Sequence, residues 1–514
     1  MPFSSSCLSI NPKTSVTGKR NFPGFCLLPI VKLGPGPGAD SLTWGTGVFR
    51  SLFLAALLVT FAVFVPASRA EPLSGKQVRD VPAIQHEQFI ELILHGDPVH
   101  AEGFLADLEK NWSADYIPAV LETIHFSRSV MIRTRLVTLL AEKTGIDNLD
   151  DMPRWYQWLW HQPERQWPDY GEFKASLYQR IDPAFEVYFR NRAASARIRL
   201  DEIVWGGVKQ DGIPPLRYPA MLNADQADYL EDDNIVFGVA IDGDVRAYPK
   251  RILAWHEMFI DTFGKGENQQ TIAGVYCTLC GAVIIYKTEH AGVNHQLGTS
   301  GFLYRSNKLM YDKATRSLWS TVRGEPVLGP LVGQGIALEH LSVVTTTWGE
   351  WRRRHPETRV LSLDTGHRRD YGEGVAYRDY FASDALMFST PFQDKRLKNK
   401  REVLALRFFA APDEQLAIDT EYLKLHPVFH HQIGQQKFVV LTDKTGANRV
   451  YDPGQITLVS YDGIDTVVDA EGTAWRIGEA ALTSEQGQSL PSLPYHRAFW
   501  FGWLAAYPET RLIK

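Results

Sequence analysis

Cysteine is scarce in this chain, and the scarcity limits its covalent chemistry. The 514 residues include 4 cysteines, and two of them, Cys7 and Cys26, lie within the first 70 residues. If that leader is removed on export, Cys277 and Cys280 are the only cysteines of the mature protein. A framework of several disulfides, as in small secreted domains, is therefore excluded.

The chain also has little that is apolar enough to cross a membrane. The apolar run at residues 52–65 is about 14 residues long, whereas a spanning helix needs about 20. Arg50 precedes the run, and Ser68-Arg69-Ala70 follows it with small residues where an export peptidase cleaves. This pattern predicts a signal peptide in a leader of residues 1–70, and so a periplasmic or secreted protein. The alternative is an uncleaved segment that anchors the protein to the membrane.

The true N-terminus is a separate question. Residues 1–47 are unusual in front of a signal peptide, and no methionine lies between Met1 and Met131. A GTG start codon at Val48 would give a conventional signal of about 23 residues. We therefore expect Val48 to be a candidate for the true start.

The chain has fewer basic than acidic residues. The leader carries six basic residues and one acidic residue, which leaves 48 basic and 58 acidic residues and a net charge of −10 in the mature chain. A strongly acidic protein lacks the basic surface that nucleic acid or anionic lipid requires. We therefore expect no nucleic-acid partner.

The two remaining cysteines lie in Tyr276-Cys277-Thr278-Leu279-Cys280-Gly281. The flanking residues 271–276 and 282–286 are rich in β-branched and aromatic side chains, which predicts two strands joined by a turn at the cysteines. A thioredoxin-type centre needs its CxxC at a helix N-terminus, so the following strand disfavours one. Three interpretations stay open: a disulfide or plain structural turn, half of a metal site, or a reactive thiol pair.

Helical periodicity dominates residues 85–197. Apolar positions in 116–121 and 130–140 fall on one face of each segment, a pairing typical of a HEAT-type helical hairpin. Many aromatic residues follow, and we expect them to pack this helical layer onto a neighbouring domain. The sequence thus predicts an all-α domain over 71–200, which is a candidate for recruiting a protein partner.

Short strands and turns take over from Trp205. Residues 235–241 and 245–248 are predicted to form a hairpin across Asp242-Gly243-Asp244. Residues 251–263 have helical character. The fold class that follows is α+β, with a HEAT-like helical domain ahead of a β-rich domain.

An internal repeat divides the β-rich region. The pattern W-x-x-W-x-x-x-[HY]-P-E-T-R begins at Trp348 and again at Trp500. We predict a first repeat over 201–370, which holds the CxxC, and a second repeat over 371–514, which lacks it.

The repeat extends to the cysteine turn. Residues 275–282 align with 440–447, where Thr442 and Thr445 replace the two cysteines. If the second hairpin forms without sulfur, then sulfur is not required to build it. This comparison favours metal or thiol chemistry for Cys277 and Cys280.

A series of short motifs runs through the β-rich region. In chain order they are Asp211-Gly212-Ile213-Pro214-Pro215, Arg246-Ala247-Tyr248-Pro249, Trp255-His256-Glu257, Tyr276-Cys277-x-x-Cys280-Gly281, Gly298-x-Ser300-Gly301-x-Leu303-Tyr304-x-Ser306-Asn307, Met310-Tyr311-Asp312 and Ser317-Leu318-Trp319-Ser320. In this order they resemble the DUF3179 family of uncharacterised bacterial and archaeal exported proteins, over about 205–514. The family has no assigned activity, so the resemblance implies membership and no function. Thr278 stands where many relatives have proline.

Candidate partners for the cysteines come from nearby polar residues. His256 precedes the hairpin and His295 follows it, and imidazole with thiolate suits zinc or copper. The predicted metal ligands are therefore Cys277, Cys280, His256 and His295. Glu257 is a candidate catalytic acid or base if burial raises its pKa. Asp312 is a second catalytic candidate, which would orient a histidine or bind metal.

Two functions follow from these residues. The first is a soft-metal-binding or thiol-dependent site at the CxxCG hairpin, for metal delivery or, with an open coordination position, hydrolysis. The alternative is an extracytoplasmic scaffold or binding module with a structural disulfide. No nucleotide-binding loop, HExxH motif or catalytic triad is legible, so the sequence points to no named enzyme activity.

Overall fold

The computed structural model describes residues 84–94, 98–146 and 151–514. The predicted leader, with its signal peptide and the start at Val48, lies outside the described residues. In the part that is described, no helix is both long enough and apolar enough to cross a membrane.

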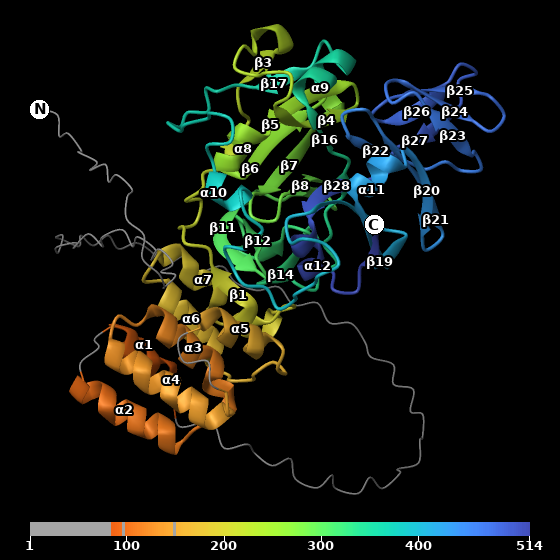
Figure 1. The fold of residues 1–514 in the computed structure, drawn as a ribbon. Helices are drawn as coiled ribbons and strands as arrows, with labels where there is room; N and C mark the ends of the chain where they lie inside the picture. The colour runs from red at the N-terminus through yellow and green to blue at the C-terminus, as the bar shows by residue number, and fades with distance from the viewer. Residues whose placement is uncertain (1–83, 95–97, 147–150) are drawn as a thin grey trace, which may run out of the picture. The chain divides into compact units, whose positions relative to one another are not determined.

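The predicted helical region is helical (Figure 1). Its α-helices are α1 (His86–Leu94), α2 (Pro98–Lys110), α3 (Ile117–Phe126), α4 (Val130–Thr144), α5 (Met152–Trp160), α6 (Tyr170–Tyr178) and α7 (Glu186–Phe189). Local sequence sets the ends of α4, because the Ser129 side chain accepts from the Ile132 amide and Gly145, at φ 71°, terminates the helix. Helices in this region are thus confirmed, and the HEAT-type arrangement stays a prediction.

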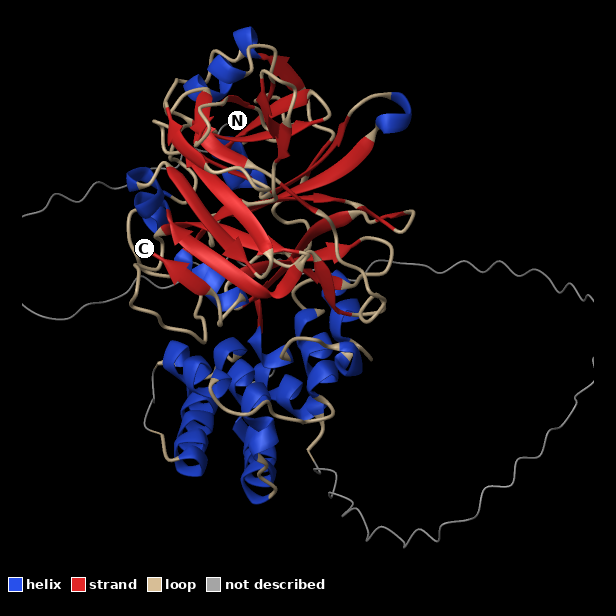
Figure 2. Ribbon diagram, turned by 90° about the vertical axis from the view of Figure 1, so that its right-hand side faces the viewer, coloured by secondary structure: helices blue, strands red, loops and turns tan. Residues whose placement is uncertain are grey.

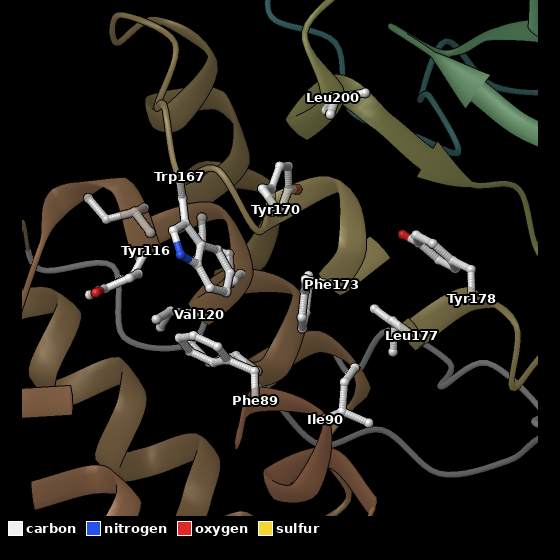
Figure 3. Packing of buried hydrophobic residues seen from close by; sticks show 14 of the residues in the cluster. Phe89, Ile90, Tyr116, Val120, Trp167, Tyr170, Phe173, Leu177, Tyr178 and Leu200 are labelled. Carbon is white, nitrogen blue, oxygen red and sulfur yellow. The ribbon is translucent and has the colours of Figure 1, made fainter. Parts of the chain in front are cut away.

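Aromatic side chains fill the core of the helical region (Figure 3). The Phe89 ring lies 5.4 Å from Trp167 and 5.9 Å from Phe173, measured between ring centroids. The same core reaches the β-rich region, where the Phe302 ring lies 4.9 Å from Tyr178. Edge-to-face packing of this kind holds the helices against the strands that follow.

Strands dominate the structure from Ile203 onward (Figure 2). One sheet has the order β1 (Ile203–Trp205), β11 (Leu297–Tyr304), β12 (Asn307–Asp312), β13 (Leu318–Ser320) and β14 (Glu325–Leu328). A second has the order β15 (His340–Leu341), β8 (Ala282–Lys287), β7 (Gln270–Cys277), β6 (Met258–Phe263) and β2 (Leu216–Arg217). A third has the order β16 (Val344–Thr347), β4 (Ile235–Ile241), β5 (Asp244–Pro249), β17 (Arg359–Leu361) and β3 (Met221–Asn223).

The last part of the chain adds three more sheets. The first has the order β28 (His496–Phe499), β18 (Glu402–Phe408), β19 (Ala411–Asp419) and β29 (Arg511–Ile513). The next consists of β20 (Val428–Ile433), β21 (Gln436–Thr442) and β22 (Asn448–Tyr451). The last is a meander of β23 (Leu458–Tyr461), β24 (Thr466–Asp469), β25 (Ala474–Ile477), β26 (Ala481–Ser484) and β27 (Ser489–Pro491). A small ribbon pairs β9 (Glu289–His290) with β10 (Val293–Asn294).

Short helices connect these strands. They are α8 (Lys250–His256), α9 (Trp348–Arg354), α10 (Arg378–Phe381), α11 (Thr420–Leu425) and α12 (Trp500–Ala506). Helices together with several sheets make the protein α+β, as the sequence predicts.

The helix predicted over 251–263 is wrong in its second half. The helix α8 stops at His256, and β6 begins at Met258, which pairs with Val275 of β7. Cross-strand pairing with β7 overrides the local helical pattern. As a result, Glu257 lies at the junction between a helix and a strand.

Candidate functional site

The two cysteines close the turn of the predicted hairpin. Strands β7 and β8 pair antiparallel, with Cys277 opposite Ala282. Cys277 and Cys280 form a disulfide, with their Cα atoms 5.4 Å apart. Gly281 takes a φ of 58°, a left-handed conformation that glycine adopts without strain, and so lets the chain turn into β8.

The disulfide is sealed from solvent. Cys277 is 2% exposed and Cys280 is 1% exposed, and both belong to an apolar cluster. Residues of β28 and α12 cover much of the disulfide. The Phe499 amide donates to the Cys280 carbonyl at 2.8 Å, and a Cβ atom added at Gly502 would lie 2.5 Å from the Cys280 Cβ.

A long connection also contributes to the cover. Residues 362–401 join β17 to β18, and α10 lies within them. The Tyr380 hydroxyl donates to the Leu279 carbonyl inside the cysteine turn at 2.6 Å. Long loops with little regular structure are often functional, and this one packs on the disulfide turn.

Glu257 belongs to a buried polar cluster behind the hairpin. Its φ of 55° is left-handed, which is unusual for a residue with a side chain. Its Oε2 atom lies 2.8 Å from Lys308 Nζ, and its Oε1 atom accepts from the Tyr377 hydroxyl at 3.1 Å. Its carbonyl also accepts from Lys308 Nζ, and from the Tyr276 amide at 2.9 Å.

Burial controls protonation in this cluster. It lowers the pKa of the Lys308 ammonium, and the Glu257 carboxylate opposes that shift. Burial, and then the charge of Glu257, raise the pKa of the Tyr377 hydroxyl, which stays protonated and donates. Both carboxylate oxygens of Glu257 are engaged by these partners, so the cluster ties α8, β12 and the 362–401 connection together.

His256 points into a different network. Its Nδ1 atom lies 2.9 Å from the Pro214 carbonyl, which only accepts, so Nδ1 carries the proton. Its Nε2 atom therefore accepts from the Tyr371 hydroxyl, which also bonds to Thr365 Oγ1. Burial lowers the pKa of His256 and favours this neutral form. Both ring nitrogens are thus engaged away from the cysteines.

His295 and Asp312 lie beside each other. His295 Nδ1 is 3.5 Å from Asp312 Oδ2, and the His295 ring packs on Trp319 at 5.0 Å between centroids. Asp312 Oδ1 accepts from the backbone amide and the hydroxyl of Thr315. Asp312 thus contacts a histidine, and it also holds the turn that follows β12.

These placements bear on the predicted metal site. Across 84–94, 98–146 and 151–514, no group of three or more His, Cys, Asp or Glu side chains is arranged to hold a metal ion. The donor set at the hairpin does not fit a metal in this state, because a disulfide has no thiolate to offer. The structure joins Cys277 to Cys280 but does not group His256 or His295 with them. Zinc or copper at this hairpin stays a prediction.

Sequence reasoning missed Lys308 and Tyr377. Lys308 carried a usable signal, since it interrupts the otherwise largely apolar run at 307–311, and a lysine in a buried strand requires a charged partner. Tyr377 lies in an irregular connection, and no local pattern identifies it.

An open groove lies between the helical region and the 362–401 connection. It has a volume of about 500 Å³ and is lined by Arg154, Gln157, Trp158, His161, Pro391 and Gln393. Gln393 Nε2 donates to Gln157 Oε1 at 3.1 Å across it. Tryptophan and arginine, both present here, are enriched at protein–protein interfaces relative to the rest of the surface.

Comparison with known proteins identifies a family and no close relative. No curated protein and no solved structure matches the chain. A family described as a protein of unknown function, DUF3179, matches residues 210–510, which is more than half of the chain. The matched segment contains the disulfide hairpin, Glu257 and Lys308. The chain therefore belongs to the DUF3179 family of proteins of unknown function.

Proposed function

We propose that the protein is a scaffold or binding module in which Cys277–Cys280 is a structural disulfide. A disulfide that exchanges with other thiols must be reached by an attacking thiolate. The near-complete burial of both cysteines in an apolar cluster opposes such an attack. A stable disulfide also fits an extracytoplasmic location, where oxidising conditions maintain it.

The observation that carries this proposal is how the turn between β21 and β22 is closed. There Asp443 Oδ1 accepts from the Thr445 amide at 2.9 Å and from the Ala447 amide at 3.0 Å. At the position of Asp443 the cysteine turn has Thr278, whose buried Oγ1 has no hydrogen-bond partner among the described residues. In the first hairpin the disulfide therefore closes the turn, as the hydrogen bonds of Asp443 do in the second. Closing a turn is a structural role.

We also infer that the β-rich region consists of two copies of one unit. The order β16-β4-β5-β17 in the first half parallels β28-β18-β19-β29 in the second, with a parallel final pair in each. In each unit, a tryptophan in the helix before the last strand donates a hydrogen bond to a threonine. Trp351 Nε1 donates to Thr358 Oγ1 at 3.0 Å, and Trp503 Nε1 donates to Thr510 Oγ1 at 2.9 Å.

The groove beside α5 is the proposed binding surface. Trp158 offers a large, partly exposed ring, and Arg154 and His161 flank it. Aromatic and arginine side chains are the residues most often responsible for binding energy at protein interfaces. A protein partner that docks on the helical region would use this surface.

Counting thiols and metal tests the disulfide. Protein purified from the periplasm of an expression host should show no titratable thiol, native or unfolded, until a reductant is added. It should also carry no metal at the hairpin. Titratable thiols, or one equivalent of metal that is lost in Cys277→Ser, would favour the metal or thiol site instead.

Site-directed photo-crosslinking tests the binding surface. A photoreactive residue in place of Trp158 should give a discrete protein adduct in cells, and the adduct should weaken when Arg154→Ala is added. The same probe at Phe409, an exposed residue of the β-rich region, is the matched control. Equal adducts at both positions would contradict a partner site at the groove.

A further inference from the structure

Three of the sequence motifs meet around one carboxylate. The first motif begins at Asp211, whose Oδ2 atom accepts from the hydroxyl of Tyr311, in the middle of the Met310-Tyr311-Asp312 motif, at 2.6 Å. Its Oδ1 atom accepts from the Thr299 amide at 3.0 Å. A Cβ atom added at Gly298 would lie 2.4 Å from Tyr311 Cε1 and 2.9 Å from Asp211 Oδ1. Neither the disulfide nor the groove beside α5 uses this cluster.

Three half-buried cationic side chains surround the cluster. They are Arg217, Lys313 and Arg316. Arg217 Nη2 donates to the Leu297 carbonyl at 2.8 Å, and the Lys313 amide donates to the neighbouring Gln296 carbonyl at 2.9 Å. The Arg316 guanidinium lies 5.4 Å from the centroid of the Tyr311 ring. The three cations thus converge from β2, from the end of β12 and from the turn that follows it.

These three charges are not neutralised by the chain. Arg217 bonds to a carbonyl and Arg316 Nη1 bonds to Gln210 Oε1 at 3.0 Å, both of which are uncharged acceptors. Within the residues that the structure describes, Lys313 Nζ makes no hydrogen bond and none of the three forms an ion pair. Burial, and then the charge of Arg217, lower the pKa of the Lys313 ammonium, Asp211 opposes them, and Arg316 lowers it further. The positive charges therefore face one another.

The nearby acids leave an excess of positive charge. Both oxygens of Asp211 already accept hydrogen bonds, so it can offset one of the three cations but not all of them. Asp182 accepts from two backbone amides. Asp312 alternates with Tyr311 along β12 and lies beside His295, on the other face of the strand. Three cations and the one charge of Asp211 leave two positive charges without a partner.

We propose that Arg217, Lys313 and Arg316 bind a phosphoryl group, either as free phosphate or as part of a phosphate ester. A phosphate monoester carries close to two negative charges at neutral pH, which matches the excess of positive charge. Arginine binds phosphate through its planar fork of donors, and lysine binds it as a point charge. This site is separate from the disulfide and from the proposed partner surface.

Asp211 acts as a positioning residue in this proposal. It holds the Tyr311 hydroxyl, which accepts from Gln210 Nε2 at 3.1 Å, and the same Gln210 side chain accepts from Arg316. Asp211 and Arg316 both take a left-handed backbone, with φ of 51° and 57°. Side-chain-bearing residues seldom adopt this conformation, and such strain is concentrated at functional sites.

Calorimetric titration of the intact protein at pH 7 tests the site. The probes are inorganic phosphate and glycerol 3-phosphate, with sodium chloride holding the ionic strength constant. We expect one equivalent to bind, and the tighter of the two probes shows whether the site takes the free ion or an ester. Saturation by neither probe would overturn the proposal. So would tighter binding of succinate, a dicarboxylate of similar charge.

Matched variants assign the cations. Lys313→Met and Arg316→Gln should each weaken binding at least tenfold, because each removes a charged donor. Lys110→Met makes the same change at an exposed lysine of α2 and should bind as the wild type does. Unchanged binding in Lys313→Met and Arg316→Gln, or equal weakening in Lys110→Met, would overturn the assignment.

Crystals of the wild type decide the matter if a variant does not fold. Tungstate is a heavy analogue of phosphate, and its anomalous scattering locates it. Tungstate between Arg217, Lys313 and Arg316 would support the site. Tungstate bound elsewhere only, or not at all, would overturn it.

Discussion

Gly502 of α12 lies directly against Cys280 of the disulfide, and a Cβ atom added at Gly502 would lie 2.5 Å from the Cys280 Cβ. Cys280 belongs to a buried apolar cluster that also contains Phe501 and Trp503, the residues on either side of Gly502. The close approach therefore requires glycine at this position of the helix.

Gly502→Ala should destabilise the protein. Glycine to alanine in a helix normally stabilises by about 0.5–1 kcal/mol, but overpacking of a core costs about 1–3 kcal/mol. We expect the cost of overpacking to exceed the gain in helix propensity, so the free energy of unfolding, measured in urea, should fall. Gly103→Ala in α2 is the control, because nothing lies within 4 Å of the added atom, and it should stabilise. A stabilised Gly502→Ala would show that α12 does not press on the disulfide.

Glu257→Gln should be strongly destabilising. It removes the charge that pairs with the buried Lys308 ammonium at 2.8 Å, and breaking a buried ion pair costs about 3–5 kcal/mol. Urea unfolding at pH 7 measures the loss. The double variant Glu257→Gln/Lys308→Met should lose less than Glu257→Gln alone, because no unpaired charge remains. Additive losses in the double variant would mean that the two side chains act independently.

The stability of the protein should fall with decreasing pH, in part because of His496. Burial lowers its pKa from 6.5 to about 3, so between these values the unfolded chain binds a proton that the folded chain does not. This contribution is complete above pH 6.5 and is lost as the pH falls towards 3, by about 4–5 kcal/mol in total. Urea unfolding at pH 7.5, 6, 5 and 4 measures the slope. His496→Val should make the slope less steep without abolishing it, because burial also lowers the pKa of His340. An unchanged slope would contradict a neutral buried His496.

Removal of the disulfide should weaken the protein without unfolding it. Cys277→Thr/Cys280→Thr copies the threonines of the second hairpin. The disulfide closes only a short loop, so its removal should lower the free energy of unfolding by only about 2 kcal/mol, the entropic contribution of the cross-link. Thermal unfolding, with and without reductant, measures the change. Reductant should lower the melting temperature of the wild type and leave the double variant unaffected. A variant that is insoluble or unfolded would show that the disulfide is required for folding.

A disulfide should form when it is moved to the second hairpin. If the two turns are equivalent, Thr442→Cys/Thr445→Cys places two thiols where the first hairpin has Cys277 and Cys280. They should oxidise to a second bridge, which thiol alkylation and mass spectrometry would detect. Free thiols after oxidation would show that the Asp443 turn has a different geometry.

Prediction from sequence was correct for elements that are specified by residues close to one another in the chain. The strands on either side of Cys277 and Cys280 and the turn glycine Gly281 follow from residue type and spacing, because hairpins are specified by neighbours. The helices α3 and α4 follow from apolar periodicity in the same way. The error at Met258, a predicted helix that is a strand, arose because β7 supplies its pairing partner from outside the local window.

By itself, the sequence determined the family, the α+β class, and the hairpin turn that holds Cys277 and Cys280. Only the tertiary structure decided which residues distant in the sequence meet. Gly502 reaches Cys280, Lys308 reaches Glu257 and His496 reaches His340 across long stretches of chain. Such contacts depend on how sheets pack and which strands pair. A one-residue change in register would turn strand residues such as Lys308 and His496 to the opposite face. The local sequence around each residue does not specify which distant strand it pairs with or which sheet packs against it.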